Sequence, residues 1–138
     1  MLYFEDLSEG QSAEIERTVS AADIDAFAAV SGDVNPVHLD AAYAATTQFG
    51  ERIAHGMLAG AFISAVLGAK LPGPGAIYLS QSLRFRRPVK IGDTVSAQVA
   101  VTGLDDRRGH VTLATVCQVN GKPVVEGEAL VMVPRRPA

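Results

Sequence analysis

The segment 31–38 holds the residues best suited to proton transfer in this sequence. Asp33 and His38 lie five residues apart, and Pro36 between them restricts the backbone and disfavours helix just before it. A carboxylate and an imidazole held in this way can share one water molecule and move its protons. The same residues also fit an Asx-type turn at Asp33 or Asn35 with a histidine on the surface. Spacing alone leaves both interpretations open.

A second candidate for chemistry is Gly56, which stands immediately before a long apolar stretch, residues 57 to about 70. That stretch predicts a helix. The first backbone N–H groups of a helix have no partner within it and lie at the positive end of its dipole. Because glycine has no side chain, a substrate carbonyl could approach such an N–H closely and use it as an oxyanion hole. The alternative is that Gly56 serves only the turn into the helix.

His55 and the single cysteine, Cys117, are expected to have structural roles. His55 is interpreted as a structural residue at the start of the helix. A metal site built from Asp33, His38 and His55 is not expected, because the spacing lacks the signals typical of metal ligands. Cys117 lies in an expected strand, where a lone thiol fills apolar space. We therefore expect no metal centre.

The composition limits the functions open to the chain. Its 138 residues, of which 48% are hydrophobic, fit one compact domain over residues 1–138. A net charge of −3 argues against nucleic-acid binding, which depends on clustered lysine and arginine. One basic cluster either meets the phosphate groups of a ligand or keeps an edge strand solvated. Its members are Arg84, Arg86, Arg87 and Lys90.

Export and membrane insertion are not expected. The first residues lack the basic and apolar regions of a secretory signal, and a single cysteine excludes an intrachain disulfide. The most apolar stretch, residues 53–69, contains polar side chains and is shorter than the roughly 20 residues that span a bilayer. We therefore expect a cytoplasmic protein. A mean hydropathy of +0.19 is high for so small a domain and predicts self-association.

Apolar periodicity places helices mainly in the first half of the chain and strands mainly in the second. Residues 12–19 alternate as a half-buried strand does. Ser20 and Asp23 resemble a capping box for a helix that Gly32 stops, and Asp40 can cap a shorter helix after it. Further strands are expected over residues 76–85, 94–104, 110–119 and 124–133, with a two-residue turn at Asn120–Gly121.

The helix expected after Gly56 has apolar side chains all round, so it must be enclosed. A sheet that covers such a helix has to curl around it, which is the plan known as the hot dog fold. The expected fold class is therefore α+β, with an antiparallel sheet wrapped around a central, mostly apolar helix.

The motif Asp33-x-Asn35-Pro36-x-His38, followed by the segment Ala-His-Gly-Met at 54–57, resembles the MaoC-like, R-specific enoyl-CoA hydratases. The resemblance covers nearly the whole chain, including segments 39–40 and 77–83. It is strongest to the short, single-domain bacterial form that supplies (R)-3-hydroxyacyl-CoA for polyhydroxyalkanoate synthesis. It implies a hot dog fold, a homodimer whose sheets join, no metal or prosthetic group, and Asp33 and His38 as the catalytic pair.

The resemblance also implies roles for individual residues. By position in the motif, Gly56 would supply the oxyanion N–H, and Ser64 matches a residue found near the active site of the short members. Asn35 would orient the loop or the water. The implied reaction adds water across the C2–C3 double bond of a trans-2-enoyl-CoA, which needs a base, a proton for C2 and stabilisation of enolate charge. We expect Asp33 and His38 to hold that water, and which of them is formally the base stays open, because coupled groups titrate as a pair.

Two other functions compete with hydration. One is a hot dog acyl-CoA thioesterase, but hydrolysis needs water at the thioester carbonyl, whereas water held by Asp33 and His38 suits attack at C3. The other is a non-catalytic acyl-CoA-binding module, which would be indicated by replacement of either residue, and both are present. The sequence thus favours hydration.

Overall fold

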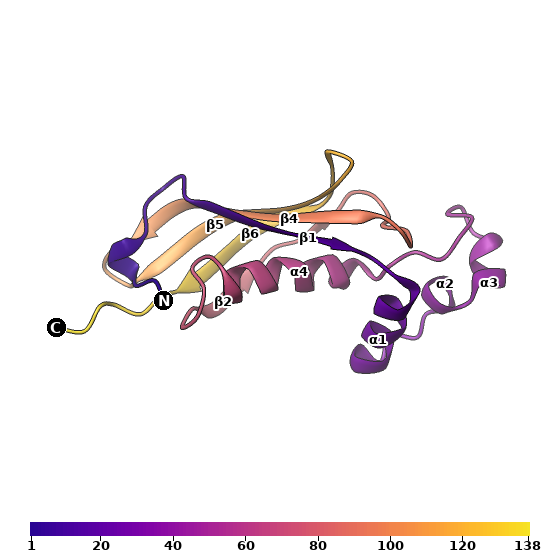
Figure 1. The fold of residues 1–138 in the computed structure, drawn as a ribbon, viewed down its shortest axis with the longest axis horizontal. Helices are drawn as coiled ribbons and strands as arrows, with labels where there is room; N and C mark the ends of the chain where they lie inside the picture. The colour runs from indigo at the N-terminus through magenta and orange to yellow at the C-terminus, as the bar shows by residue number, and fades with distance from the viewer.

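The chain folds around one antiparallel sheet, with helix α4 lying along one face of it (Figure 1). The computed structural model describes every residue from Met1 to Ala138. This arrangement confirms the expected α+β class and hot dog plan. In chain order the elements are η1 (Phe4–Asp6), β1 (Ser12–Thr18), α1 (Ala21–Ser31), α2 (Pro36–Leu39), α3 (Ala41–Ala45), α4 (Gly56–Ala69), β2 (Ile77–Gln81), β3 (Arg84–Phe85), β4 (Thr94–Asp105), β5 (His110–Val119) and β6 (Lys122–Met132).

The sheet has the strand order β1-β4-β5-β6-β2, and the short strand β3 also pairs with β6. Every pairing is antiparallel. Asn120 and Gly121 join β5 to β6 with positive φ angles of 52° and 75°, which confirms the predicted two-residue turn. The expected boundaries are right for β5 and differ by one or two residues for β4 and β6.

The apolar core lies between α4 and the sheet. Val95, Ala97, Val99 and Val101 alternate along β4 on the face toward the helix, and each is at most 2% exposed. From α4, Ile63 is fully buried against this face. Burying an aliphatic side chain of this size stabilises the fold by about 1.5–3 kcal/mol. These side chains belong to one cluster of 25 buried residues, so a single core holds helix and sheet together.

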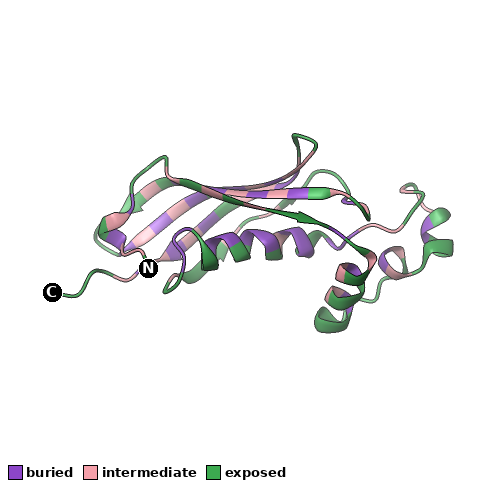
Figure 2. Ribbon diagram, viewed as in Figure 1, coloured by how far each residue is buried: buried purple, intermediate pink, exposed green.

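Helix α4 is not enclosed on all sides within one chain, which corrects the sequence-based expectation. Its buried residues are Leu58, Ala59, Phe62, Ile63, Val66 and Leu67. The opposite side carries Met57, Ala61, Ser64, Ala65 and Gly68, which are exposed (Figure 2). The reason is geometric, because the sheet of one chain covers one side of the helix only. None of the helices has the length and apolar character needed to cross a membrane.

The single strand expected over residues 76–85 is interrupted. β2 and β3 both pair with β6, and Ser82 and Leu83 between them lie outside the strands, although the Ser82 N–H still donates to the Glu128 carbonyl at 2.9 Å. There Leu83 turns toward Gly60 of α4, while the Ser82 carbonyl approaches β6 so closely that a Cβ on Gly127 would lie 1.8 Å from its oxygen. Gly127 therefore allows the backbone approach that bends this edge of the sheet.

The helical arm, defined as residues 20–55, projects beyond the end of α4 (Figure 1). Ser20 and Asp23 form the predicted capping box of α1, with hydrogen bonds of 3.1 and 2.9 Å, and Gly32 ends the helix at φ 79°. The Asp40 side chain accepts the Tyr43 N–H at 3.1 Å and caps α3 as predicted. The short helix α2 between them was not expected. It follows the loop that carries Asp33.

Candidate active site

Three side chains fold the loop between α1 and α2 back on its own backbone. Ser31 Oγ accepts the Asp33 N–H at 3.1 Å, and Asp33 Oδ1 accepts the Asn35 N–H at 3.2 Å. Asn35 Oδ1 then accepts the Val37 N–H at 3.2 Å and caps α2, whose first residue is proline. The Asx turns considered from the sequence are therefore present at both Asp33 and Asn35, and they lead the chain directly to His38.

His38 is buried, with only 8% of its surface exposed, so the interpretation as a surface histidine is wrong. Its Nδ1 lies 2.8 Å from the carbonyl oxygen of Ile53. A carbonyl can only accept a hydrogen bond, so in the neutral ring Nδ1 carries the proton and Nε2 keeps a free lone pair. Arg52 Nε donates to the His38 carbonyl at 2.6 Å, and its guanidinium is paired with Asp25 of α1 at 2.6 Å. His38 is thus tied to the neighbouring segment through both its ring and its backbone carbonyl.

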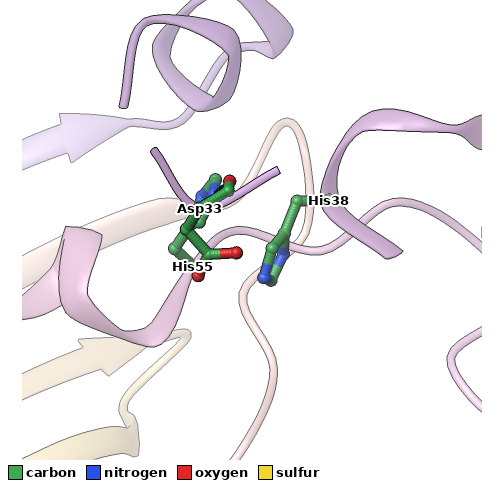
Figure 3. A group of neighbouring side chains, drawn as sticks. All are labelled: Asp33, His38 and His55. Carbon is green, nitrogen blue, oxygen red and sulfur yellow. Dashed lines mark hydrogen bonds between the residues drawn. The ribbon is translucent and has the colours of Figure 1, made fainter. Parts of the chain in front are cut away.

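Asp33 and His38 lie close to each other without a direct hydrogen bond between them. One ligand-type atom each of Asp33, His38 and His55 lies within 4.8 Å of the others, and no direct hydrogen bond joins Asp33 to His38. Figure 3 shows the Asp33 carboxylate directed toward the His38 ring. Two hydrogen bonds of about 2.8 Å each, through one water oxygen, span such a distance. The predicted sharing of a water by this pair is therefore geometrically feasible.

The same three residues form a poor metal site. The rings of His38 and His55 are stacked, with centroids 3.9 Å apart and an angle of 27° between their planes. The nitrogen lone pairs of two nearly parallel rings point along the planes of those rings. They do not converge on one ion at about 2.0–2.1 Å, the length of a Zn–N bond. The stacked rings are therefore unfavourable for a shared metal ion, and proton transfer by Asp33 and His38 stays a prediction.

Gly56 is the first residue of α4, and its position explains why no side chain is present. Its φ is not in the left-handed region, so the turn into the helix does not itself demand glycine. A Cβ at this place would lie 2.6 Å from Cε1 of Phe85 in β3. The close approach of that ring is the local reason for glycine. As the first helical residue, Gly56 also has an N–H that the helix cannot use.

A cavity of about 560 Å³ brings these groups together at the junction of the helical arm with the start of α4. Asp33, His38 and Gly56 all line it, and 13 of its 21 lining residues are hydrophobic, which suits an apolar ligand with a polar reacting group. Asn35 and Ser64 are not among the lining residues. Ser64 is exposed on α4, eight residues beyond Gly56, a rise of about 12 Å along a helix axis.

The aromatic walls of this cavity were not identified from the sequence. Phe27 of α1, Phe49, Phe62 of α4 and Phe85 of β3 all line it. Helical spacing marked the apolar faces of the two helices, but it gives no information on which element each face meets. A larger depression of about 940 Å³ next to β4, β5 and β6 contains no histidine or aspartate.

The basic cluster is partly neutralised. Arg86 pairs with Glu126 at 2.6 Å, and Lys90 lies 3.6 Å from a carboxylate oxygen of Glu51. Arg87 donates to the Pro123 carbonyl at 2.7 Å, and together with Arg86 it lines the cavity. Two guanidinium groups therefore stand at the site, and that of Arg86 is paired with Glu126.

The single cysteine is remote from this chemistry. Cys117 is fully buried on β5, and its Sγ contacts the Ala59 carbonyl oxygen at 3.4 Å. Burial raises the pKa of its thiol to about 12, so the reactive thiolate is not formed near neutral pH. Its predicted role as an apolar filler is confirmed.

The chain is similar in sequence and fold to known proteins. Residues 5–122 match the family described as MaoC like domain. The chain is 60% identical over 134 residues to the (R)-specific enoyl-CoA hydratase of Rhodospirillum rubrum. The aligned residues make up 97% of this chain and 93% of the relative. The R-hydratase PhaJ1 of Pseudomonas aeruginosa has a TM-score of 0.93 at 53% identity, with 97% of this chain and 86% of that chain covered. The (R)-hydratase of Aeromonas caviae, involved in PHA biosynthesis, has a TM-score of 0.92 at 47% identity, with coverage of 94% and 99%. The chain therefore belongs to the MaoC-like domain family.

Proposed function

We propose that the protein hydrates trans-2-enoyl-CoA to (R)-3-hydroxyacyl-CoA. The observation that carries this proposal is the placement of the Asp33 carboxylate beside His38 in an apolar cavity that also contains Gly56. The free lone pair of His38 Nε2 follows from the bond between Nδ1 and Ile53. The names of the relatives from Rhodospirillum rubrum and Pseudomonas aeruginosa support the same reaction and its stereochemistry.

The step requires three contributions from the protein. Water bonded to Asp33 and His38 gives a proton to the pair while its oxygen forms the new bond to C3. The C2–C3 π electrons move toward the thioester, and the Gly56 N–H stabilises the charge that develops on the thioester oxygen. The pair then returns a proton to C2 on the same face, which restores both residues. Since the shared water couples the two groups, the pair acts as one acid–base unit.

Physiologically, we propose that the product enters polyhydroxyalkanoate synthesis, linking fatty-acid β-oxidation intermediates to the polymer. The support is the relation to the Aeromonas caviae hydratase, whose name includes PHA biosynthesis. A cytoplasmic location, where acyl-CoA thioesters are available, is part of this proposal. Disruption of the gene in its host should lower polymer made from fatty acids, and unchanged polymer would count against the pathway.

Absorbance of the conjugated enoyl thioester tests the reaction directly. The expected result is loss of that absorbance on addition of enzyme, with no release of free thiol. Release of thiol would indicate the thioesterase alternative, and binding of substrate without any change in absorbance would indicate the non-catalytic module. Coupling the product to R- and S-specific dehydrogenases then assigns the stereochemistry, and S product would contradict the proposal.

The proposed step uses acid–base groups only, so no cofactor is required beyond the CoA that belongs to the substrate. Activity should survive exhaustive dialysis against a chelator such as EDTA. Loss of activity that added metal restores would overturn this part of the proposal.

We further propose that the working unit is a homodimer. β2 lies at the edge of the sheet, and Ile77, Tyr78 and Leu79 on it are 52%, 40% and 43% exposed. An apolar edge strand of this kind is seldom left free in a soluble protein. The exposed side of α4, with Met57 55% exposed, adds a second apolar surface. Light scattering at micromolar concentration should report a dimer, and a fully active 14.5 kDa monomer would contradict it.

A further inference from the structure

His55, which the sequence assigned only a structural role, contacts both members of the acid–base pair. Its Nε2 lies 2.9 Å from the Asp33 carbonyl oxygen, and its ring stacks on that of His38 at 3.9 Å. We propose that His55 is a positioning residue that sets the separation and orientation of Asp33 and His38. This inference rests on the proposed function, because it concerns the same site (Figure 3).

The hydrogen bond of His55 holds the Asp33 loop. Because the Asp33 carbonyl can only accept, Nε2 carries the ring proton and donates it. The loop itself is closed by local bonds within residues 31–37, which shape it but do not tie it to α4. His55 is the N-terminal cap position of α4, so its bond fixes the loop against the helix that presents Gly56.

The stacking contact holds the His38 ring. Rotation of an imidazole about its side-chain bonds is limited here by two contacts, the Ile53 carbonyl at Nδ1 and the His55 ring at 3.9 Å. Phe27 packs on His55 with ring centroids 4.8 Å apart and planes 55° apart, so the supporting ring is itself fixed. His38 Nε2 thereby keeps one direction relative to the Asp33 carboxylate.

His55 is one of the residues that line the cavity, but its ring is almost fully covered, so it acts through its neighbours rather than on substrate. It is 3% exposed, its Nε2 is engaged by Asp33, and its Nδ1 is buried with no hydrogen-bond partner. A buried acceptor without a partner lowers stability, so a residue selected only for packing would better be apolar. The donor at Nε2 and the flat ring are the two properties that explain a histidine at this place.

Two substitutions separate those properties. His55→Gln keeps an N–H donor near the place of Nε2 but removes the ring, whereas His55→Phe keeps a ring for stacking but removes the donor. We expect each variant to lower kcat by about 10- to 100-fold, the scale of a 1 Å misplacement of catalytic groups, with KM changed by less than about threefold. His110→Gln on β5, at the far end of the sheet from the cavity, is the matched control and should keep wild-type kcat and KM.

A merely structural role gives a different pattern. If His55 positions the pair, either His55 substitution should cause little further loss of kcat when Asp33 is already replaced by Asn. If the losses of kcat from the two substitutions add, and their size parallels the fall in Tm, the proposal is overturned. Wild-type kcat in both folded variants would also overturn it while leaving the hydratase function intact. Amide hydrogen exchange of residues 31–38 needs no turnover. Exchange of these amides should accelerate in His55→Phe, which lacks the donor to the Asp33 carbonyl. Unchanged exchange in both His55→Phe and His55→Gln would contradict the proposal, whether or not the wild-type protein hydrates the substrate.

Discussion

Two regions of the molecule are held together by different kinds of contact. The first is the sheet with α4 packed on it, and the second is the helical arm. The first region contains nearly all of the cluster of 25 buried apolar residues, to which the arm contributes only Ile24 and Ala54. Within the arm and at its junction with α4, single hydrogen bonds to backbone carbonyls join the segments. They come from Arg52, His38 and His55.

The difference has a physical consequence. Apolar burial is non-directional and scales with area, so it stabilises a fold without setting the angle of any one group. Hydrogen bonds depend on distance and angle, so they orient the groups that they join. The acid–base pair lies in the region held by directional bonds. Substitutions in the two regions should therefore separate stability from activity.

The largest effect is expected from the pair itself. Asp33→Asn keeps an oxygen that can accept the Asn35 N–H, and His38→Asn keeps a donor for the Ile53 carbonyl. Both variants therefore retain the local hydrogen bond that each side chain makes to the backbone. Each change, like His38→Ala, should lower hydration of a short enoyl-CoA by about 10²- to 10⁴-fold through loss of general acid–base catalysis. Initial rates and circular dichroism measure activity and fold. Near-normal turnover in any folded variant would refute the assignment.

The opposite outcome is expected in the sheet. Leu113 on β5 is fully buried, and Leu113→Ala should lower the free energy of unfolding by about 2–5 kcal/mol. Leu104 on β4 is 37% exposed, so Leu104→Ala is the matched control with a much smaller loss. Urea unfolding measures both. Because the core does not orient the site, kcat of the folded Leu113 variant should match wild type. A large loss of kcat at unchanged KM would break the comparison between the two regions.

The third test addresses Gly56, where the two regions meet. Gly56→Ala adds a Cβ that must displace the Phe85 ring, which is 54% exposed and can move. Gly56→Pro adds the same carbon and also removes the N–H, a change tolerated at the first helical position. If the N–H stabilises the transition state, Pro should lose about 2.7–4 kcal/mol beyond Ala in kcat/KM.

Phe85→Ala provides the control for that test. It removes the ring that an added Cβ would meet, so it should restore activity to Gly56→Ala but not to Gly56→Pro. Equal activity of the Ala and Pro variants would show that the N–H is not used.

The regions also differ in what the sequence could reveal. Alternation along β4 and β5 and the two-residue turn at Asn120 predicted the sheet, because those patterns repeat or have a strict φ requirement. Helix α2 was missed, since four residues are too few to show helical periodicity. The motif identified Asp33 and His38.

The burial of His38 and the contacts that support the acid–base pair could not be predicted from local sequence. The hydrogen bond from His38 reaches Ile53, fifteen residues away, and the bond between Asp33 and His55 spans 22 residues. Phe85 meets Gly56 only after the chain returns from α4 to the sheet. Such contacts depend on how elements pack, which periodicity within one element does not encode.

The smallest effect is expected at the start of α1, which belongs to the arm but does not touch the pair. Hydrogen bonds from the Ser20 backbone N–H and side chain, with a weaker attraction from Arg17, hold the pKa of Asp23 below its ordinary value of 3.8. Because the folded pKa is the lower one, the ionised carboxylate stabilises the fold above pH 3.8, and this stabilisation is lost as pH falls through the folded pKa. Asp23→Asn should therefore lower the free energy of unfolding at pH 6 by about 0.3–1 kcal/mol, the range for a charge at a helix terminus.

Below the folded pKa of Asp23 the wild-type and Asn variants should converge in stability, because both side chains are then neutral. Urea unfolding at pH 6 and at pH values falling below 3.8 measures this convergence. Glu9→Gln, at an exposed residue outside the helices and strands, should show no such pH-dependent difference. Wild-type kcat in Asp23→Asn is also expected, since α1 reaches the site only through its C-terminal end, at Phe27 and Ser31. A loss of kcat in Asp23→Asn at pH 6, with stability unchanged, would show that the orienting contacts of the arm extend to its first turn.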